Sequence, residues 1–159
     1  MANKEQYPKI LIALHWLTAL LLGANYVVSD GMGGALERHI EGAATSGFVA
    51  NFHVYVGIAI SVLITIRIVA RLLMTAPEPI GKPASNLANA SRLAHLGLYL
   101  LMVAGPALGL IAWYGNIDSL GSIHALVING LITLAGIHAA AAIFHQLVLK
   151  DSLLTRMRF

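Results

Sequence analysis

The sequence of 159 residues contains no cysteine, and this absence excludes a whole group of functions. Disulfide bonds, iron–sulfur clusters and thiolate catalysis all require cysteine, and so does the CxxCH motif that attaches a c-type haem covalently. Charge is also scarce, at 11% of the residues, whereas an average soluble domain has about 25%. With 58% hydrophobic residues and a mean hydropathy of +0.77, the chain has the composition of an integral membrane protein.

Four apolar stretches are each close to the ~20 residues that an α-helix needs to cross the hydrocarbon layer. A backbone in lipid must satisfy its own hydrogen bonds, so each stretch is expected to be a helix. The expected spans cover residues 10–28, 52–73, 93–113 and 123–149. Asn51 and Ser122 precede two of these spans and are expected to be helix caps. The predicted fold class is therefore all-α, a transmembrane four-helix bundle that forms a single domain over residues 1–159.

The basic residues are distributed unevenly between the two sides of the predicted membrane. Nine of the ten precede the first span, flank the connection between the second and third, or follow the fourth. Because cytoplasmic segments carry the excess of Lys and Arg, both termini are expected in the cytoplasm. Arg38 is the tenth, and it shares the outer segments with Asp30, Glu37, Glu41 and Asp118. The outer side therefore has a formal charge of one minus four, or −3.

Six of the seven histidines lie in or at the edge of the predicted spans. One such histidine could simply be a buried imidazole bonded to a carbonyl, but six in four helices favour a function. His124 and His138 are fourteen residues apart in the fourth span, and this spacing gives a rise of ~21 Å with both side chains on nearly the same face. Zinc ligands on a helix lie only three to five residues apart. The pattern is typical of two redox centres at different depths.

Each centre needs a second ligand at the same depth on another helix. His53 and His124 are each the second residue of a span that starts on the outer side, so they form the expected outer pair. His15 lies ~8 Å from the inner end of the first span, and His138 lies ~16 Å from the inner end of an overlong fourth span. These two form the expected inner pair. Two imidazoles fill both axial positions of a haem iron, so electron transfer through two haems is expected, without oxygen binding.

Two arginines and three glycines have expected roles around the same centres. Arg67 follows the histidine of the second span by fourteen residues, so it reaches the inner level, where it could bind a haem propionate. Arg71 lies one turn further, and its side chain could instead extend to the cytoplasmic surface. Gly57, Gly130 and Gly136 leave room either for a porphyrin edge or for close helix packing.

Two other histidines lie near the inner surface. His95, in the third span, is an alternative to His15 as the inner ligand. His145 follows His138 by seven residues and so lies on the same helix face, nearer the cytoplasm. It could serve a quinone, which takes up protons with its electrons, or it could be an ordinary interfacial histidine.

Several blocks of the sequence resemble one known family, the bacterial cytochrome b561 family of small di-haem membrane cytochromes. The blocks are LHWL around His15, NFHVYVGI around His53, IRIVARLL around Arg67, RLAHLGLYLLM around His95 and GIHAAAAIFHQLVLKDSLLTRM from Gly136 to Met157. The resemblance covers nearly the whole chain and implies two haem b groups, one held by His15 with His138 and one by His53 with His124.

The resemblance also implies a location and a reaction. It implies the bacterial inner membrane, ubiquinone as the inner-side partner with His145 at the quinone site, and oxidoreductase activity that oxidises superoxide at the outer face. The outer charge of −3 argues against an anionic substrate, because it repels one.

Two rival functions use similar features. A cytochrome b subunit that anchors a hydrogenase or formate dehydrogenase needs docking surface for its partner, and the short loops here favour a stand-alone cytochrome. A non-redox bundle with structural histidines, such as a small transporter or assembly factor, would bind no pigment. Lipid and quinone are the expected partners, a redox partner protein and the oligomeric state are left open, and no nucleic-acid partner is expected.

Overall fold

The computed structural model describes residues 6–45, 47–74, 86–150 and 154–158. Its helices are α1 (Lys9–Val27), α2 (Met32–Ile40), α3 (Phe48–Leu73), α4 (Asn86–Gly115) and α5 (Asp118–Phe144). A π-helical turn, η1 (His145–Leu149), continues α5, and a 3-10 turn, η2 (Leu154–Met157), follows. These residues contain no strand, so the all-α prediction is confirmed for the part of the chain that is described.

Four of the helices are long and apolar enough to cross a membrane, and each contains all or nearly all of one of the predicted spans. The helices begin earlier than predicted, because hydropathy marks only the part that faces lipid while helical hydrogen bonding continues beyond it. The caps predicted at Asn51 and Ser122 are therefore wrong. Gly47 precedes α3 and Ile117 precedes α5, and neither makes a side-chain cap hydrogen bond.

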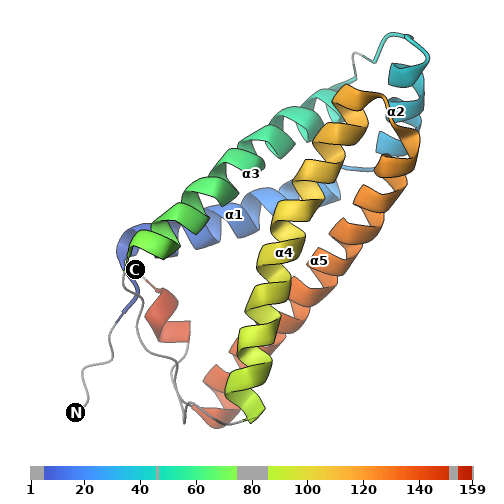
Figure 1. Ribbon diagram of the computed structural model, residues 1–159. Helices are drawn as coiled ribbons and strands as arrows, with labels where there is room; N and C mark the ends of the chain where they lie inside the picture. Colours follow the sequence, from blue (N-terminus) through green and yellow to red (C-terminus); the bar gives the residue numbers. More distant parts are fainter. Residues whose placement is uncertain (1–5, 46, 75–85, 151–153, 159) are drawn as a thin grey trace.

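Helix α2 is the element that hydropathy does not reveal, since it is short and lies outside the apolar stretches. It follows Gly31, whose φ of +83° is a left-handed conformation that glycine adopts at little cost. Its Leu36 is buried, and the ring of its His39 stacks on Trp113 of α4, with centroids 4.1 Å apart and planes 8° apart. Helix α2 thus packs against the ends of α3, α4 and α5 (Figure 1).

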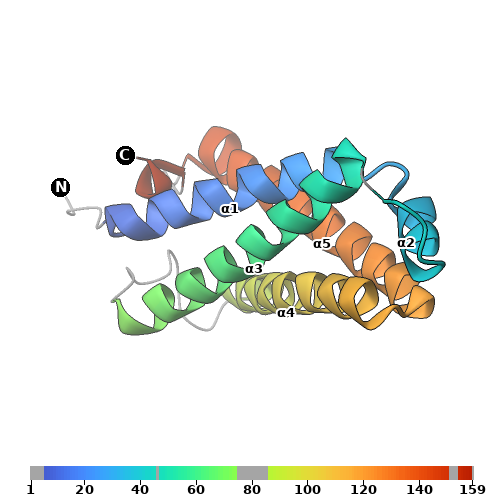
Figure 2. The same ribbon diagram turned by 90° about the horizontal axis from the view of Figure 1, so that it is seen from above.

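The long helices pack in two principal pairs, α4 along α5 and α1 along α3, and α3 also contacts α4. Helices α1 and α3 overlap near α2 in Figure 2 and at their opposite ends in Figure 1, so the two helices cross at an angle. The central core is a cluster of Ile60, Ile64, Met102 and Leu131, contributed by α3, α4 and α5. Large apolar side chains such as Leu20, Tyr55 and Leu126 point outward. In a membrane protein these outer surfaces contact lipid.

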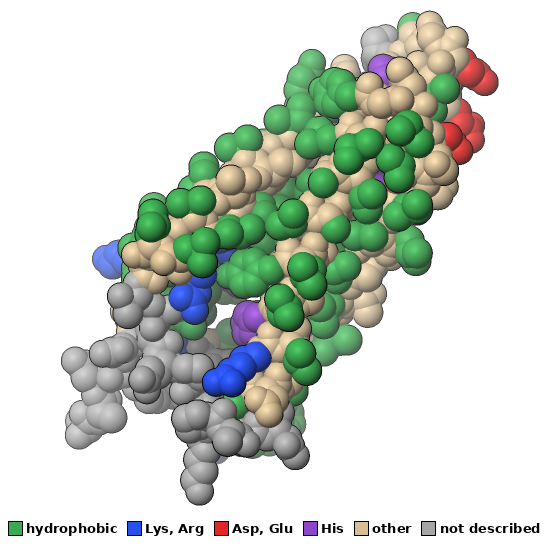
Figure 3. Space-filling model, viewed as in Figure 1, with side chains coloured by type: hydrophobic (Ala, Val, Ile, Leu, Met, Phe, Trp, Pro, Cys, Tyr) green, Lys and Arg blue, Asp and Glu red, His purple; other side chains and the backbone are tan. Residues whose placement is uncertain are grey.

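The two ends of the bundle carry opposite charge. Figure 3 shows the acidic side chains near the α2 end and the basic side chains at the opposite end, where a hollow opens beside a histidine. The first and last described segments meet at this basic end. The Tyr7 main-chain N–H donates to the Arg156 carbonyl at 3.3 Å, and Trp16 Nε1 donates to the Met157 carbonyl at 3.0 Å.

Candidate functional site

At the α2 end of the bundle, His53 of α3 and His124 of α5 face one another. Their ring centroids are 6.0 Å apart and their planes are 86° apart. Two imidazoles that bind opposite sides of one metal ion, through metal–nitrogen bonds of about 2 Å, have centroids about 6 Å apart. The separation therefore suits a pair of axial ligands to one haem iron.

The backbone of α4 fixes the orientation of the His124 ring. Nδ1 of His124 lies 2.8 Å from the Gly105 carbonyl oxygen, and since a carbonyl only accepts, Nδ1 carries the proton. Nε2 is then unprotonated and able to bind a metal, with the other ring nitrogen held by a backbone group, as metal-binding histidines usually are.

Two glycines of α4 allow this close approach. A Cβ at Gly109 would lie 2.9 Å from His124 Cε1, and a Cβ at Gly105 would lie 2.6 Å from Ile128 Cδ1. A larger residue at Gly109 would displace the His124 ring, and one at Gly105 would displace the end of the Ile128 side chain. Neither glycine was among the predicted site residues, although their Gly-x-x-x-Gly spacing in a span is a recognised signal of close helix contact.

The surroundings of His53 contain polar atoms without partners. Among the described residues, neither Nδ1 of His53 nor Oδ1 of Asn25 has a hydrogen-bond partner, although both atoms are buried. The Asn25 main chain lies within hydrogen-bonding reach of the His53 ring. A Cβ at Gly57, one turn after His53, would lie 3.9 Å from Asn25 Nδ2. A main-chain acceptor within reach of the ring could hold the proton on Nδ1, which would leave Nε2 of His53 to bind a metal ion.

Three histidines meet at the basic end of the bundle. The rings of His15 on α1 and His138 on α5 have centroids 6.5 Å apart and planes 63° apart. The ring of His95 on α4 lies closer to His138, at 5.1 Å, and its Nδ1 is 2.7 Å from the Ser91 carbonyl oxygen. Both the predicted inner ligand and its alternative therefore face His138. The described side chains include no group of three or more that could hold a bare metal ion.

Arg67 of α3 reaches the same level from the side. Its Nη2 lies 2.8 Å from Nδ1 of His15, and its Cζ lies 5.8 Å from the Tyr99 ring centroid, a cation–π contact. The guanidinium is thus partly buried beside the inner histidines, at the depth that the sequence spacing indicates. Arg71, one turn further along α3, is exposed.

Space remains beside the glycines that the sequence singled out. A Cβ at Gly130 or Gly136 would meet no atom within 4 Å, so these two glycines make no close helix contact in the described structure. His145 is the first residue of η1 and is half-buried, two turns beyond His138 toward the basic end.

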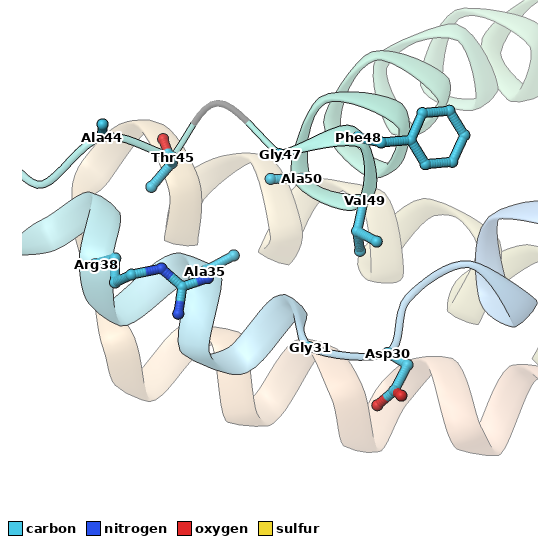
Figure 4. A pocket seen from close by; sticks show the side chains of 10 residues that line it. All are labelled: Asp30, Gly31, Ala35, Arg38, Ala44, Thr45, Gly47, Phe48, Val49 and Ala50. Carbon is cyan, nitrogen blue, oxygen red and sulfur yellow. The ribbon is translucent and has the colours of Figure 1, made fainter.

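A pocket of about 320 Å³ opens at the other end, between α2 and the start of α3 (Figure 4). Arg38 and Asp30 bring one charge of each sign to its lining, and Thr45, Val49 and Ala50 contribute small or apolar surface. Ala50 lies one turn before His53 on α3, so the pocket adjoins the outer histidine pair through this helix.

Comparison with known proteins gives this geometry a context. Residues 6–159 match a family model described as prokaryotic cytochrome b561. The chain belongs to the prokaryotic cytochrome b561 family. It is 38% identical to cytochrome b562 of Cereibacter sphaeroides over 157 residues, which cover 99% of this chain and 98% of that protein.

Two more distant relatives also align along nearly their whole length. A Yersinia pestis protein named probable superoxide oxidase CybB is 29% identical over 174 aligned positions, which cover 96% of each chain. Cytochrome b561 homolog 1 of Escherichia coli is 29% identical, with 96% of this chain and 97% of that protein covered.

Membership of the cytochrome b561 family makes this chain a membrane electron-transfer protein, and a cytochrome b carries haem b. The alternative of a non-redox bundle is therefore wrong. The residues present fit a haem: the two histidine pairs have the ring separation of axial ligands, and a backbone carbonyl holds Nδ1 of His124 so that Nε2 is able to bind iron.

Proposed function

We propose that this cytochrome b561 family member holds two haem b groups and passes single electrons across the bacterial inner membrane, from an outer-side donor to ubiquinone. The observation that carries the proposal is one geometry repeated at two depths, with paired imidazoles 6.0 Å apart at one end of α5 and 6.5 Å apart further along it. The bound haems supply a one-electron iron couple at each depth. The protein holds them, orients their ligands and excludes water.

Four histidines are the proposed axial ligands, His53 with His124 for the outer haem and His15 with His138 for the inner one. The separation of 6.5 Å between His15 and His138 is closer to the axial geometry than the 5.1 Å between His95 and His138. His95 is also held by the Ser91 carbonyl of its own helix. It therefore packs on the edge of His138 in this assignment.

Arg67 and Arg71 are the proposed cations for the inner haem's propionates. A guanidinium only donates hydrogen bonds, so His15 Nδ1 accepts in the observed 2.8 Å contact. An iron ligand that binds through Nε2 carries its proton on Nδ1. With His15 in that form, Arg67 needs another acceptor, and a propionate carboxylate beside the ring is the natural one.

The basic end of the bundle is the proposed cytoplasmic side. Nine of the ten Lys and Arg residues belong to it by sequence, and the charge separation along the described molecule is visible in Figure 3. By the positive-inside rule, α2 and the outer histidine pair then face the periplasm, and both termini are cytoplasmic.

His145 is the proposed proton-handling residue of an inner quinone site. Reduction of one ubiquinone to ubiquinol consumes two electrons and two protons, so a protonatable group beside the inner redox centre and close to water has a direct use. His145 lies at the basic end in a π-helical turn, a local structure that is frequent at functional sites. The neighbouring Val148 and Leu149 are exposed, which suits entry of a lipophilic quinone from the bilayer.

The outer donor is proposed to approach through the pocket between α2 and α3. The Yersinia relative is named a probable superoxide oxidase, which makes superoxide a candidate donor. The outer segments sum to −3 and contain one cation, Arg38, so the outer field opposes an anion. The charge of the outer segments therefore does not raise the local concentration of superoxide.

A reduced-minus-oxidised absorption spectrum, with haem quantified per chain, tests the proposal. We expect two low-spin haem b groups that acid–acetone extracts completely, because the chain has no cysteine to attach them. One haem per chain, or a high-spin spectrum, contradicts the pairing. Copurification of a hydrogenase or dehydrogenase subunit in mild detergent would favour the anchor-subunit alternative.

A further inference from the structure

The π-helical turn η1 contains a polar side chain that no role above uses. Gln146 follows His145 directly and is half-buried, and its Oε1 is buried without a hydrogen-bond partner among the described residues. A buried acceptor without a partner is destabilising and rare in native structures, where a ligand commonly satisfies it. The neighbouring Leu147 is 67% exposed, so the polar residue turns inward while the apolar one turns toward lipid.

The turn itself places these residues differently from a regular helix. Its closing hydrogen bond runs from the Lys150 N–H to the His145 carbonyl, with Lys150 in a left-handed conformation at φ 53°. A π turn spaces its hydrogen bonds five residues apart instead of four and is less stable than the α-helix it interrupts, which is why it persists mainly at functional sites. His145 and Gln146 are thus adjacent polar residues at the point where α5 departs from α-helical geometry.

We infer that Gln146 is a hydrogen-bond partner of the inner-side quinone and that it binds the reduced form, the quinol, more tightly than the oxidised form. This inference rests on the proposed function, since it deepens the quinone site of His145. A quinol carries two O–H donors and a quinone carries none, and the unsatisfied atom of Gln146 is an acceptor. In the observed orientation it is Oε1 that lies on the buried side. A quinone carbonyl can accept only from the NH2 group, so the amide must rotate before it can bond the oxidised form.

Preferential binding of the quinol has a consequence for electron flow. A site that binds the reduced form more tightly raises the reduction potential of the bound couple, by linkage between binding and reduction. Electrons that arrive one at a time from the inner centre then pass to the quinone more readily. The amide of Gln146 raises the potential of the bound couple without changing its own charge, whereas His145 supplies or takes up protons.

The test uses Gln146→Met, which keeps the length of the side chain and removes both polar atoms. Leu147→Met on the same turn is the matched control, since it introduces the same side chain at a lipid-facing position. Binding of a short-chain ubiquinol and of the matching ubiquinone to the purified, haem-loaded protein is measured anaerobically, by the rise in Tm with ligand concentration. The quinol-oxidising KM and kcat provide a second measurement.

We expect Gln146→Met to weaken quinol binding by about fivefold to tenfold, the effect of one lost hydrogen bond to a buried group, and to change quinone binding less. The KM for quinol rises accordingly with kcat little changed. The two-haem spectrum stays as in the wild type, and the ligand-free Tm does not fall, because Met removes a buried acceptor that has no partner among the described residues. Leu147→Met leaves all of these values unchanged.

Two other outcomes are informative in different ways. If the wild type binds both ligands and Gln146→Met keeps their affinity ratio, the role of Gln146 is overturned and the quinone site stands. If neither ligand raises the Tm of the wild type or exchanges electrons with it, the proposed function itself is wrong, and the inference about Gln146 is overturned with it. His145→Ala, with both haems retained, separates the two residues, because it slows the proton-coupled rate without altering the affinity ratio.

Discussion

Replacing Gly109 with alanine tests how the outer histidine pair is positioned. The added methyl group meets the His124 ring directly, because the three atoms nearest to a Cβ at this position all belong to that ring, at 2.9, 3.0 and 3.4 Å. Carbon contacts below 3.0 Å are not tolerated, so either the ring or the whole of α5 must move. Either movement lengthens or breaks the 2.8 Å hydrogen bond from His124 Nδ1 to the Gly105 carbonyl.

The size of the effect follows from three opposing contributions. Loss of the hydrogen bond costs about 0.5–1.5 kcal/mol, and overpacking at a tight contact costs about 1–3 kcal/mol. Alanine is a better helix former than glycine by about 1 kcal/mol, which offsets part of this loss. The net loss of stability is about 0.5–3.5 kcal/mol. If a central loss of about 2 kcal/mol falls wholly on the haem-bound form, the outer haem binds roughly thirtyfold more weakly.

Haem per chain and a redox titration of the purified variant measure this outcome. We expect Gly109→Ala to lose outer haem, or to shift its midpoint potential, while the inner haem keeps its spectrum. Gly33→Ala is the control, because a Cβ at that position of α2 meets no atom within 4 Å. Two haems with unchanged potentials in Gly109→Ala would refute the reasoning that α4 orients His124, and equal loss of both haems would show that Gly109 acts on the whole bundle.

Four further outcomes are expected. Leucine at either histidine of a pair removes the haem of that pair. The variants at His53 and His124 therefore share one spectrum, and the variants at His15 and His138 share another. His95→Leu keeps both haems, and a spectrum like that of the inner class would make His95 the inner ligand. Arg67→Gln keeps both haems but lowers the inner midpoint potential, and an unchanged potential in a redox titration would remove Arg67 from the propionate site. Haem reduction by pulse-generated superoxide is expected to speed up as salt screens the outer charge of −3. The Debye length is ~8 Å at physiological ionic strength. A fast rate that salt lowers would show that the local charge at the outer haem outweighs the total charge of the outer segments.

The spans and the facing of the histidines could be predicted because they depend on regular geometry. A helix rises by a fixed amount per residue, so fourteen residues between His124 and His138 determine both their separation and their common face. Successive spans cross the membrane in opposite directions. The direction of a span fixes which of its ends lies near each membrane surface, and this gives the depth of each histidine. The structure places His53 against His124 and His15 against His138, the arrangement that this reasoning indicates.

Helix α2, the role of Gly109 and the π turn could not be predicted in this way. The first two depend on contacts between residues far apart in the chain, and no periodic pattern in a single sequence reveals any of the three. Helix α2 is held by packing of Leu36 and by stacking of His39 on Trp113, residues that are distant in sequence. The role of Gly109 depends on which ring lies opposite it. The π turn at His145 has no compositional signature, since HQLVL would continue an α-helix equally well.

The environments of the two pairs differ in a way that gives the electron path a direction. The outer ring of His124 is held by a neutral carbonyl, at the end of the bundle where the acidic side chains gather. The inner ring of His15 lies 2.8 Å from the Arg67 guanidinium, at the basic end. A cation disfavours the more positive, oxidised iron and so raises the potential of a nearby haem, whereas surrounding carboxylates lower it. The shift from one partly buried charge is on the order of tens of millivolts, reduced where propionates neutralise it. Electrons are therefore expected to be more stable on the inner haem than on the outer one, which favours transfer from the periplasmic side toward the quinone.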